Sequence, residues 1–134
     1  MLDIILIQDN DTGLDLLEYR QENTTVKIEH TDIFSGFMTA IQNISEQLDI
    51  GWVALISTQG TKGHNCIIVK SYPINIIMLV DQGDPIEHWK EAGNLIAKEF
   101  LEMFGKDFDP HIISQFKKFT PIIKEFCLND NYCD

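Results

Sequence analysis

The stretch TDIFSGFMTAIQNISEQL, residues 31–48, is the clearest amphipathic helix in the sequence. Its apolar side chains recur every three or four positions, which places them on one stripe of a helix. Thr31 or Asp32 can cap the N-terminal end, because a short side-chain oxygen accepts a hydrogen bond from a free backbone N–H. We expect the stripe to face a core, and it consists of Phe34, Phe37, Ile41, Ile44 and Leu48.

One glycine interrupts this amphipathic pattern. Gly36 lies within the first turns of the helix, where glycine costs about 1 kcal/mol relative to alanine. Glycine at such a place suggests that another element packs closely against the helix backbone. We therefore predict close contact between helix and sheet at Gly36, and we expect Gly36→Leu to damage folding.

The other flank of this helix carries little charge for so acidic a chain. Glu46 is its charged residue, whereas the helical stretch after Pro85 alternates Glu and Lys. Loss of charge beside Met38 is typical of the centre of a protein–protein interface. A helix buried within one chain has the same composition, so both interpretations stay open. The uncharged members of the flank are Thr39, Gln42, Asn43 and Ser45.

Five runs around this helix have the composition of β-strands. The first, LDIILIQ, is almost wholly apolar, as in a strand that is buried on both faces. Turn residues separate the runs, with DNDTG after the first and TQGTKG after the third, and both sequences favour hairpins. Consecutive strands with short links predict an antiparallel sheet. The runs are residues 2–8, 14–20, 51–57, 64–71 and 74–81.

A helix is expected directly after the last strand. Apolar side chains recur at helical spacing over residues 86–104. Asp84 is the candidate N-cap, with Pro85 at the first helical position. Gly105 is the candidate stop, because glycine readily adopts the backbone conformation that ends a helix.

A final helix is expected over residues 110–126, where a second apolar stripe appears. Pro121 lies inside that stripe and removes a backbone hydrogen bond, so we expect a break near residues 119–120. The polar tail, residues 129–134, is expected to fray. Residues 1–128 then form a single domain.

The element order is therefore β-β-α-β-β-β-α-α. Amphipathic helices need an apolar surface, and a five-stranded antiparallel sheet supplies one, so the order predicts an α+β fold with helices against the sheet. A chain of 134 residues is long enough to bury a core without disulfides or metal.

The charge balance argues against several partners. The chain has 21 acidic and 10 basic residues, a net charge of −11, and such a field repels nucleic-acid phosphates and anionic lipids. The apolar run of residues 74–80 is far shorter than the ~20 residues of a membrane helix. Because the start at Met1 shows no signal-peptide pattern, we expect a cytoplasmic protein that binds no nucleic acid and does not insert into membranes.

Three cysteines make an odd count, and we expect free thiols at Cys66, Cys127 and Cys133. Cys66 follows His64 by two positions on a predicted strand, so both side chains point to one face. This pair is the best candidate for a metal site or a nucleophile. A closed zinc site needs four ligands and a reactive thiolate needs positive surroundings, and the sequence supplies neither. We predict no metal, no cofactor and no catalytic residue.

The motif DIFSGFMTAI, residues 32–41, and the element order resemble the longin domain family, a profilin-like α+β fold of trafficking proteins. The chain is most similar to small single-domain longin or roadblock-like proteins of archaea. The resemblance covers the opening hairpin LDIILIQDNDTGLDLLEYR, the helix, the strands of residues 52–81 and both closing helices. Roadblock domains open with a helix, whereas this chain opens with a strand, so the longin family is favoured.

This resemblance implies an adaptor rather than an enzyme. Longin domains are dimerisation modules, often scaffolds for small GTPases or parts of vesicle-trafficking complexes, so the resemblance implies a homodimer or a heterodimer with another longin or roadblock domain. In the family the first helix and the third strand, an edge strand, form the partner surface. An unpaired edge strand is a template for a second chain. Carried onto this sequence, that surface contains Met38, Gln42, Ser45, Trp52, Ala54 and Ile56.

Two other function classes stay open. A small-molecule sensor of the profilin or PAS type requires a cavity between sheet and helix with a few inward polar groups. A metal- or thiol-dependent enzyme requires that His64 and Cys66 act together.

Overall fold

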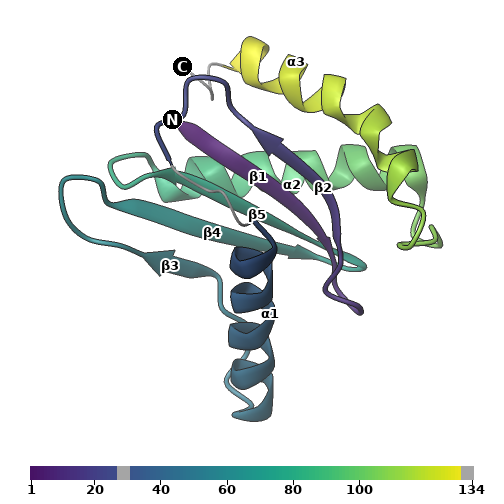
Figure 1. The fold of residues 1–134 in the computed structure, drawn as a ribbon, viewed down its shortest axis with the longest axis horizontal. Coiled ribbons are helices and arrows are strands. Elements are labelled where there is room, and N and C mark those ends of the chain that lie inside the picture. The colour runs from purple at the N-terminus through teal and green to yellow at the C-terminus, as the bar shows by residue number, and fades with distance from the viewer. Residues whose placement is uncertain (27–30, 131–134) are drawn as a thin grey trace.

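The computed structural model describes residues 1–26 and 31–130, apart from the side chains of residues 31–33 and 128–130. The predicted caps Thr31 and Asp32 and the tail from residue 131 lie outside the described side chains. The chain forms a sheet with helices on both faces (Figure 1). Its elements are β1 (Leu2–Asp9), β2 (Asp15–Arg20), α1 (Thr31–Gln47), β3 (Leu55–Ser57), β4 (His64–Ser71), β5 (Ile74–Asp81), α2 (Ile86–Phe104), the 3₁₀ helix η1 (Ile113–Phe119) and α3 (Thr120–Asp130).

The sheet has five antiparallel strands in the order β2-β1-β5-β4-β3. This confirms the predicted α+β class and the β-β-α-β-β-β-α-α order, with a short 3₁₀ helix added before α3. β1 and β5 lie in the middle and are the most apolar strands, because both of their faces are covered. β3 has three residues and is shorter than the run of residues 51–57 suggested.

Two hydrophobic clusters lie on opposite faces of the sheet. The larger cluster joins the sheet to α2, η1 and α3, with Phe100, Phe116 and Phe119 fully buried. The smaller one lies under α1 and centres on Ile4, Leu6, Cys66, Ile68 and Met38. Burial is therefore concentrated on the α2 face, and α1 projects away from the sheet (Figure 1).

The close approach of a helix to the sheet occurs on α2. A Cβ built on Gly93 would lie 2.7 Å from Met78 Cε and 2.8 Å from Val69 Cγ2, whereas a Cβ on Gly36 would meet nothing within 4 Å. The prediction of close contact at Gly36 is wrong, because this residue lies on the exposed side of α1.

Of the two predicted ends of α2, only the C-terminal one is confirmed. Gly105 ends the helix with φ 73°, and its N–H donates to the Leu101 carbonyl, as expected for a glycine stop. The predicted Asp84 cap is wrong: no side chain caps this end. The Asp84 carboxylate instead accepts a hydrogen bond from Trp89 Nε1 at 3.1 Å and from the Met1 ammonium.

The predicted break in the last helix is confirmed. The chain changes from η1 to α3 between Phe119 and Thr120, one residue before Pro121, whose missing N–H is tolerated in a first helical turn. α3 runs to Asp130, so the predicted tail from residue 129 begins inside the helix. Within the described residues, none of the helices is both long and apolar enough to cross a membrane.

Candidate functional site

The face that α1 turns to the sheet is mostly polar. Gln8 is the polar residue that ends the apolar run of β1, and its Nε2 lies 3.0 Å from Ser35 Oγ and 3.3 Å from Thr39 Oγ1. The Ser35 hydroxyl in turn donates to the Asp15 carboxylate. Because buried polar groups need hydrogen-bond partners, the face of α1 that packs against Gln8 carries short polar side chains.

A second polar contact holds α1 to the segment before β3. Gln42 Nε2 donates to the Val53 carbonyl at 2.9 Å, and the Val53 N–H donates to Gln42 Oε1 at 2.9 Å. The side-chain amide thus pairs with the backbone as a neighbouring strand would. This contact fixes the position of the edge of the sheet relative to α1.

The apolar stripe of α1 therefore points mostly to solvent. Phe37 is 54% exposed, Ile44 57% and Leu48 63%, so the prediction that this stripe faces the core is wrong for these three. Helical periodicity identifies two faces but not which of them meets the sheet. Phe34 and Ile41 are half-buried at the margin.

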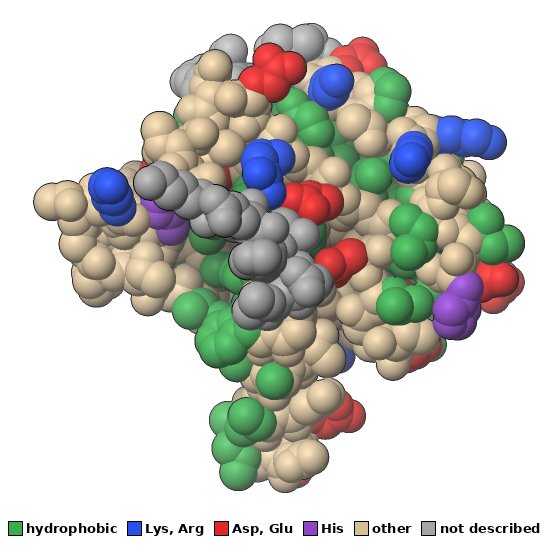
Figure 2. Space-filling view, viewed as in Figure 1, with side chains coloured by type: hydrophobic (Ala, Val, Ile, Leu, Met, Phe, Trp, Pro, Cys, Tyr) green, Lys and Arg blue, Asp and Glu red, His purple; other side chains and the backbone are tan. Residues whose placement is uncertain are grey.

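Further exposed apolar residues continue this stripe along the chain toward the edge of the sheet. Ile50 is 72% exposed and Trp52 58%. Apolar side chains gather over the projecting α1 in Figure 2. We call the region formed by this stripe and the segment that leads into β3 the α1–β3 surface, and its exposed members are Phe37, Ile44, Leu48, Ile50 and Trp52.

The predicted interface residues divide into four groups. Met38 is 1% exposed and Ser45 5%, because their flank of α1 faces the sheet, which was one of the two interpretations left open by the sequence. Gln42 is occupied by the Val53 contact. Trp52 is exposed as expected.

The other two predicted interface residues, Ala54 and Ile56, are half-buried beside β4. Phe37, Ile44 and Leu48 were missed as surface residues. Gln8 was the available signal, since a polar side chain on a buried strand requires polar neighbours.

β3 lies at an edge of the sheet. It pairs with β4 from Leu55↔Ile67 to Ser57↔Asn65, and no strand in the described part of the chain covers its other side. Such an edge leaves backbone N–H and C=O groups open to a further strand. Leu55 pairs with Ile67 of the α2-face cluster and Ile56 with Cys66 of the cluster under α1, so Ile56, rather than Leu55, turns its side chain toward the α1 side of this open edge.

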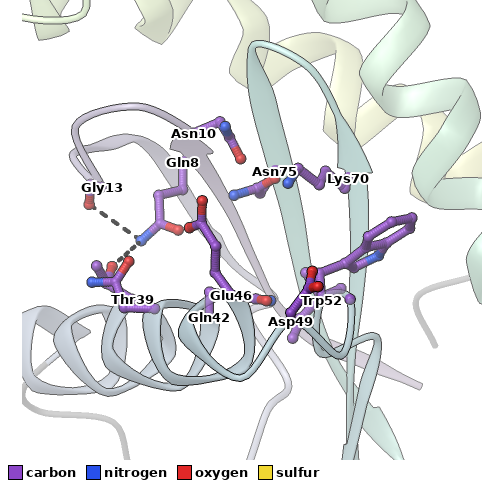
Figure 3. A pocket seen from close by; sticks show the side chains of 13 residues that line it. Gln8, Asn10, Gly13, Thr39, Gln42, Glu46, Asp49, Trp52, Lys70 and Asn75 are labelled. Atoms are coloured by element: carbon purple, nitrogen blue, oxygen red, sulfur yellow. Dashed lines mark hydrogen bonds between the residues drawn. The ribbon is translucent and has the colours of Figure 1, made fainter.

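A polar cleft of about 300 Å³ lies between α1 and the sheet. In Figure 3, Gln8 and Asn75 of the sheet and Glu46 of α1 point into it. The buried Asn75 Oδ1 has no hydrogen-bond partner within the described residues. Lys70 lies beside the cleft with its Nζ 5.6 Å from the centre of the Trp52 ring.

The His64–Cys66 pair does not form a reactive site. Cys66 is 4% exposed and lies in the cluster under α1, where burial raises the pKa of its thiol to about 12. A thiol with such a pKa is protonated at neutral pH and is a poor nucleophile or ligand. His64 Nε2 faces Asp3 and Asp81 instead.

One cysteine departs from the expected free thiols. Cys66 is free, but Cys127 on α3 is disulfide-bonded. The prediction of a free thiol is therefore wrong for Cys127. Cys133 lies outside the described residues.

The comparisons with known proteins identify the fold. No protein-family model matches the chain, and no curated protein matches its sequence. The Roadblock/LC7 domain from Streptomyces avermitilis superposes with a TM-score of 0.57 at 8% identity, over 76% of this chain and 84% of that chain. Myxococcus xanthus MglB superposes with a TM-score of 0.52 at 11% identity, over 75% and 85%.

The chain has a longin-like fold. Its element order, with α1 between β2 and β3, matches the expectation from the sequence, and β3 lies at the edge of the sheet as the resemblance implied. At identities of 8% and 11% the two likenesses establish the fold of the chain and nothing further.

Proposed function

We propose that this longin-like domain is a cytoplasmic, non-enzymatic adaptor that pairs with a second copy of itself through the α1–β3 surface. The observation that carries this proposal is an exposed apolar stripe on α1, extended by Ile50 and Trp52 along the chain that leads into an open edge strand. A contiguous apolar patch on a soluble domain marks an interaction site more often than scattered single residues do.

A second copy fits both parts of this surface. Two β3 edges related by a two-fold axis can pair antiparallel and join two sheets into one. The same axis brings the exposed stripes of the two α1 helices together over the joint, so that each covers the other's Phe37, Ile44 and Leu48. A related longin or roadblock domain with the same edge can substitute for the second copy.

Replacing Ile44 with aspartate is expected to weaken self-association by at least about 30-fold, because a buried charge without a partner costs ~2 kcal/mol or more at an interface. Size-exclusion chromatography with light scattering over a concentration series measures the monomer–dimer equilibrium. Leu95→Asp is the matched control, since Leu95 is 50% exposed on α2, which packs on the opposite face of the sheet.

The wild type and Leu95→Asp should form dimers, and Ile44→Asp should remain a monomer with an unchanged circular-dichroism spectrum. A wild-type protein that stays monomeric at millimolar concentration contradicts the homodimer. Equal dimerisation of the two variants contradicts the assigned surface.

We further propose that the paired domain binds a small GTPase within a trafficking or signalling complex. The resemblance to longin domains supports this step. Immobilised wild type and Ile44→Asp, exposed to extract of the native cell, test it by mass spectrometry. Retention of a small GTPase by the wild type but not by the variant supports a scaffold that requires the dimer, and retention of none contradicts the proposal.

The polar cleft favours a second candidate, a sensor of small molecules. The cleft lies near the lower size limit of ligand sites, and both Lys70 and Glu46 line it. Opposite charges beside an unpaired Asn75 Oδ1 suit a small zwitterion, such as a free α-amino acid.

A panel of free amino acids added to the protein in thermal unfolding is expected to raise the Tm for at least one of them. The gain should disappear in Lys70→Ala, which removes the cation beside the cleft, and persist in Lys62→Ala, whose side chain does not line it. No shift with any amino acid, or equal shifts in both variants, would remove this candidate.

A further inference from the structure

Three potential ligands meet at one end of the sheet, away from the α1–β3 surface. His64 begins β4 and Asp81 ends β5, and the two are Cα partners in the antiparallel pair. Asp3 lies on β1 where the pairing with β5 shifts register, between Leu2↔Val80 and Ile4↔Leu79. A bulge of this kind redirects a side chain. Ligand atoms of Asp3, His64 and Asp81 all lie within 4.8 Å of one another.

The hydrogen bond on the far side of His64 determines what its Nε2 can do. His64 Nδ1 lies 2.7 Å from the Lys62 carbonyl oxygen. A carbonyl oxygen only accepts, so Nδ1 carries the hydrogen. In the neutral ring Nε2 then presents a lone pair, and it points at Asp3 Oδ2 at 3.2 Å and Asp81 Oδ1 at 3.5 Å. Three acceptor atoms therefore face one another.

The Asp3 carboxylate is the least accommodated of the three. The residue is 1% exposed, and its Oδ2 has no hydrogen-bond donor among the described residues. Its Oδ1 accepts from the Thr24 hydroxyl at 2.6 Å. A buried carboxylate with one oxygen unpaired is unfavourable unless a cation approaches that oxygen.

The spacing fits a directly bound metal ion. Bonds of about 2.0–2.2 Å at tetrahedral angles place ligand atoms about 3.3–3.6 Å apart, close to the 3.2 and 3.5 Å seen here. The Lys62 carbonyl behind His64 and the Thr24 hydroxyl behind Asp3 are contacts of the kind that orient metal ligands.

The remaining coordination position is accessible. The Met1 ammonium lies 3.3 Å from Asp81 Oδ2 and leaves Oδ1 toward His64. His64 and Asp81 both line a pocket between the 60–63 turn and the 81–83 turn, through which water or a small ligand can reach the ion. One imidazole with two carboxylates suits a first-row divalent ion better than Mg²⁺ or Ca²⁺, which prefer oxygen ligands alone.

We propose that Asp3, His64 and Asp81 bind a divalent first-row transition-metal ion of the Zn²⁺ type. The ion links the ends of β1, β4 and β5 and keeps one position open toward the pocket. This metal-site proposal is independent of the proposed adaptor function, because none of the three residues belongs to the α1–β3 surface.

Titration of Zn²⁺ into chelator-treated protein by calorimetry tests this site. The expected result is one Zn²⁺ per chain, with binding weakened at least about a hundredfold in His64→Gln and in the isosteric Asp3→Asn. His111→Gln is the matched control, because His111 is exposed and also faces an aspartate, Asp109, at 3.2 Å. Mg²⁺ should not compete with Zn²⁺ at equal concentration.

A nitrogen NMR measurement on the wild type avoids dependence on variants. Addition of Zn²⁺ should shift His64 Nε2 and leave Nδ1 protonated. The proposal would be overturned if His64 were an imidazolium at neutral pH and its nitrogen signals did not change with Zn²⁺. In that case the doubly protonated ring, and not a metal ion, would pair with the two carboxylates. Equal Zn²⁺ affinity in the wild type and a folded His64→Gln would also overturn it.

Discussion

Replacing Gly93 with leucine is expected to lower the free energy of unfolding by roughly 3 kcal/mol or more, because the new side chain has no room between α2 and the sheet. Its Cβ alone would lie 2.8 Å from Val69 Cγ2 and 2.7 Å from Met78 Cε. Met78 can move its flexible end, but Val69 is β-branched and stiff. Denaturant unfolding followed by circular dichroism measures the loss.

Gly36→Leu is the matched control for this substitution. Both glycines lie in helices, and both changes add the same atoms. At Gly36 the added Cβ meets nothing within 4 Å, and leucine is the better helix former, so the free energy of unfolding should rise by about 0.5–1 kcal/mol. Similar losses in the two variants would contradict the asymmetry between α1 and α2.

This pair of glycines illustrates what the sequence determines. Local rules depend on neighbouring residues, and they predicted β4, β5 and α2 with the observed bounds. They also predicted the break before Pro121 and the stop at Gly105. Close contact between helix and sheet depends on residues far apart in the chain. Composition alone did not distinguish Gly36 from Gly93.

The same distinction explains the candidate surface. The amphipathic pattern correctly predicted α1 and its two faces, but the assignment of faces depended on Gln8, which lies 27 positions before its partner Ser35. The position of β3 at the sheet edge was implied by the resemblance to longin domains. The exposure of the α1 stripe together with Trp52 could be recognised only from the three-dimensional arrangement.

The disfavoured His64–Cys66 candidate is excluded for a related reason. Residues two apart on a strand share a face, but the environment changes along that face. His64 lies at the rim of the sheet beside Asp81, whereas Cys66 lies one step further in, under α1. Strand periodicity predicts direction and not depth, so the carboxylate partners of His64 could not be identified from spacing.

The second large effect is expected at the centre of the aromatic cluster on the α2 face. Phe100→Ala should lower the free energy of unfolding by about 3–5 kcal/mol, the usual cost of removing a buried phenylalanine ring. Phe100 is fully buried. Its ring centre lies 4.7 Å from that of Phe104, 5.2 Å from Phe119, 5.5 Å from Phe116 and 6.0 Å from Phe108.

The loss of stability in Phe100→Ala should be unevenly distributed along the chain. Phe100 belongs to α2, while Phe116 and Phe119 belong to η1, so the cavity removes the contacts that hold η1 to the rest of the domain. Hydrogen exchange should therefore accelerate first in residues 113–119, while β1 and β5, paired to each other at the centre of the sheet, keep their protection.

Leu95→Ala, also on α2 but 50% exposed, is the control and should change the free energy of unfolding by no more than about 0.5 kcal/mol. A typical domain has only 5–15 kcal/mol in total, so Phe100→Ala should approach the limit of folding while Leu95→Ala does not. If the two losses were equal, or if exchange rose uniformly across the sheet, the aromatic cluster would not be what attaches η1 to α2.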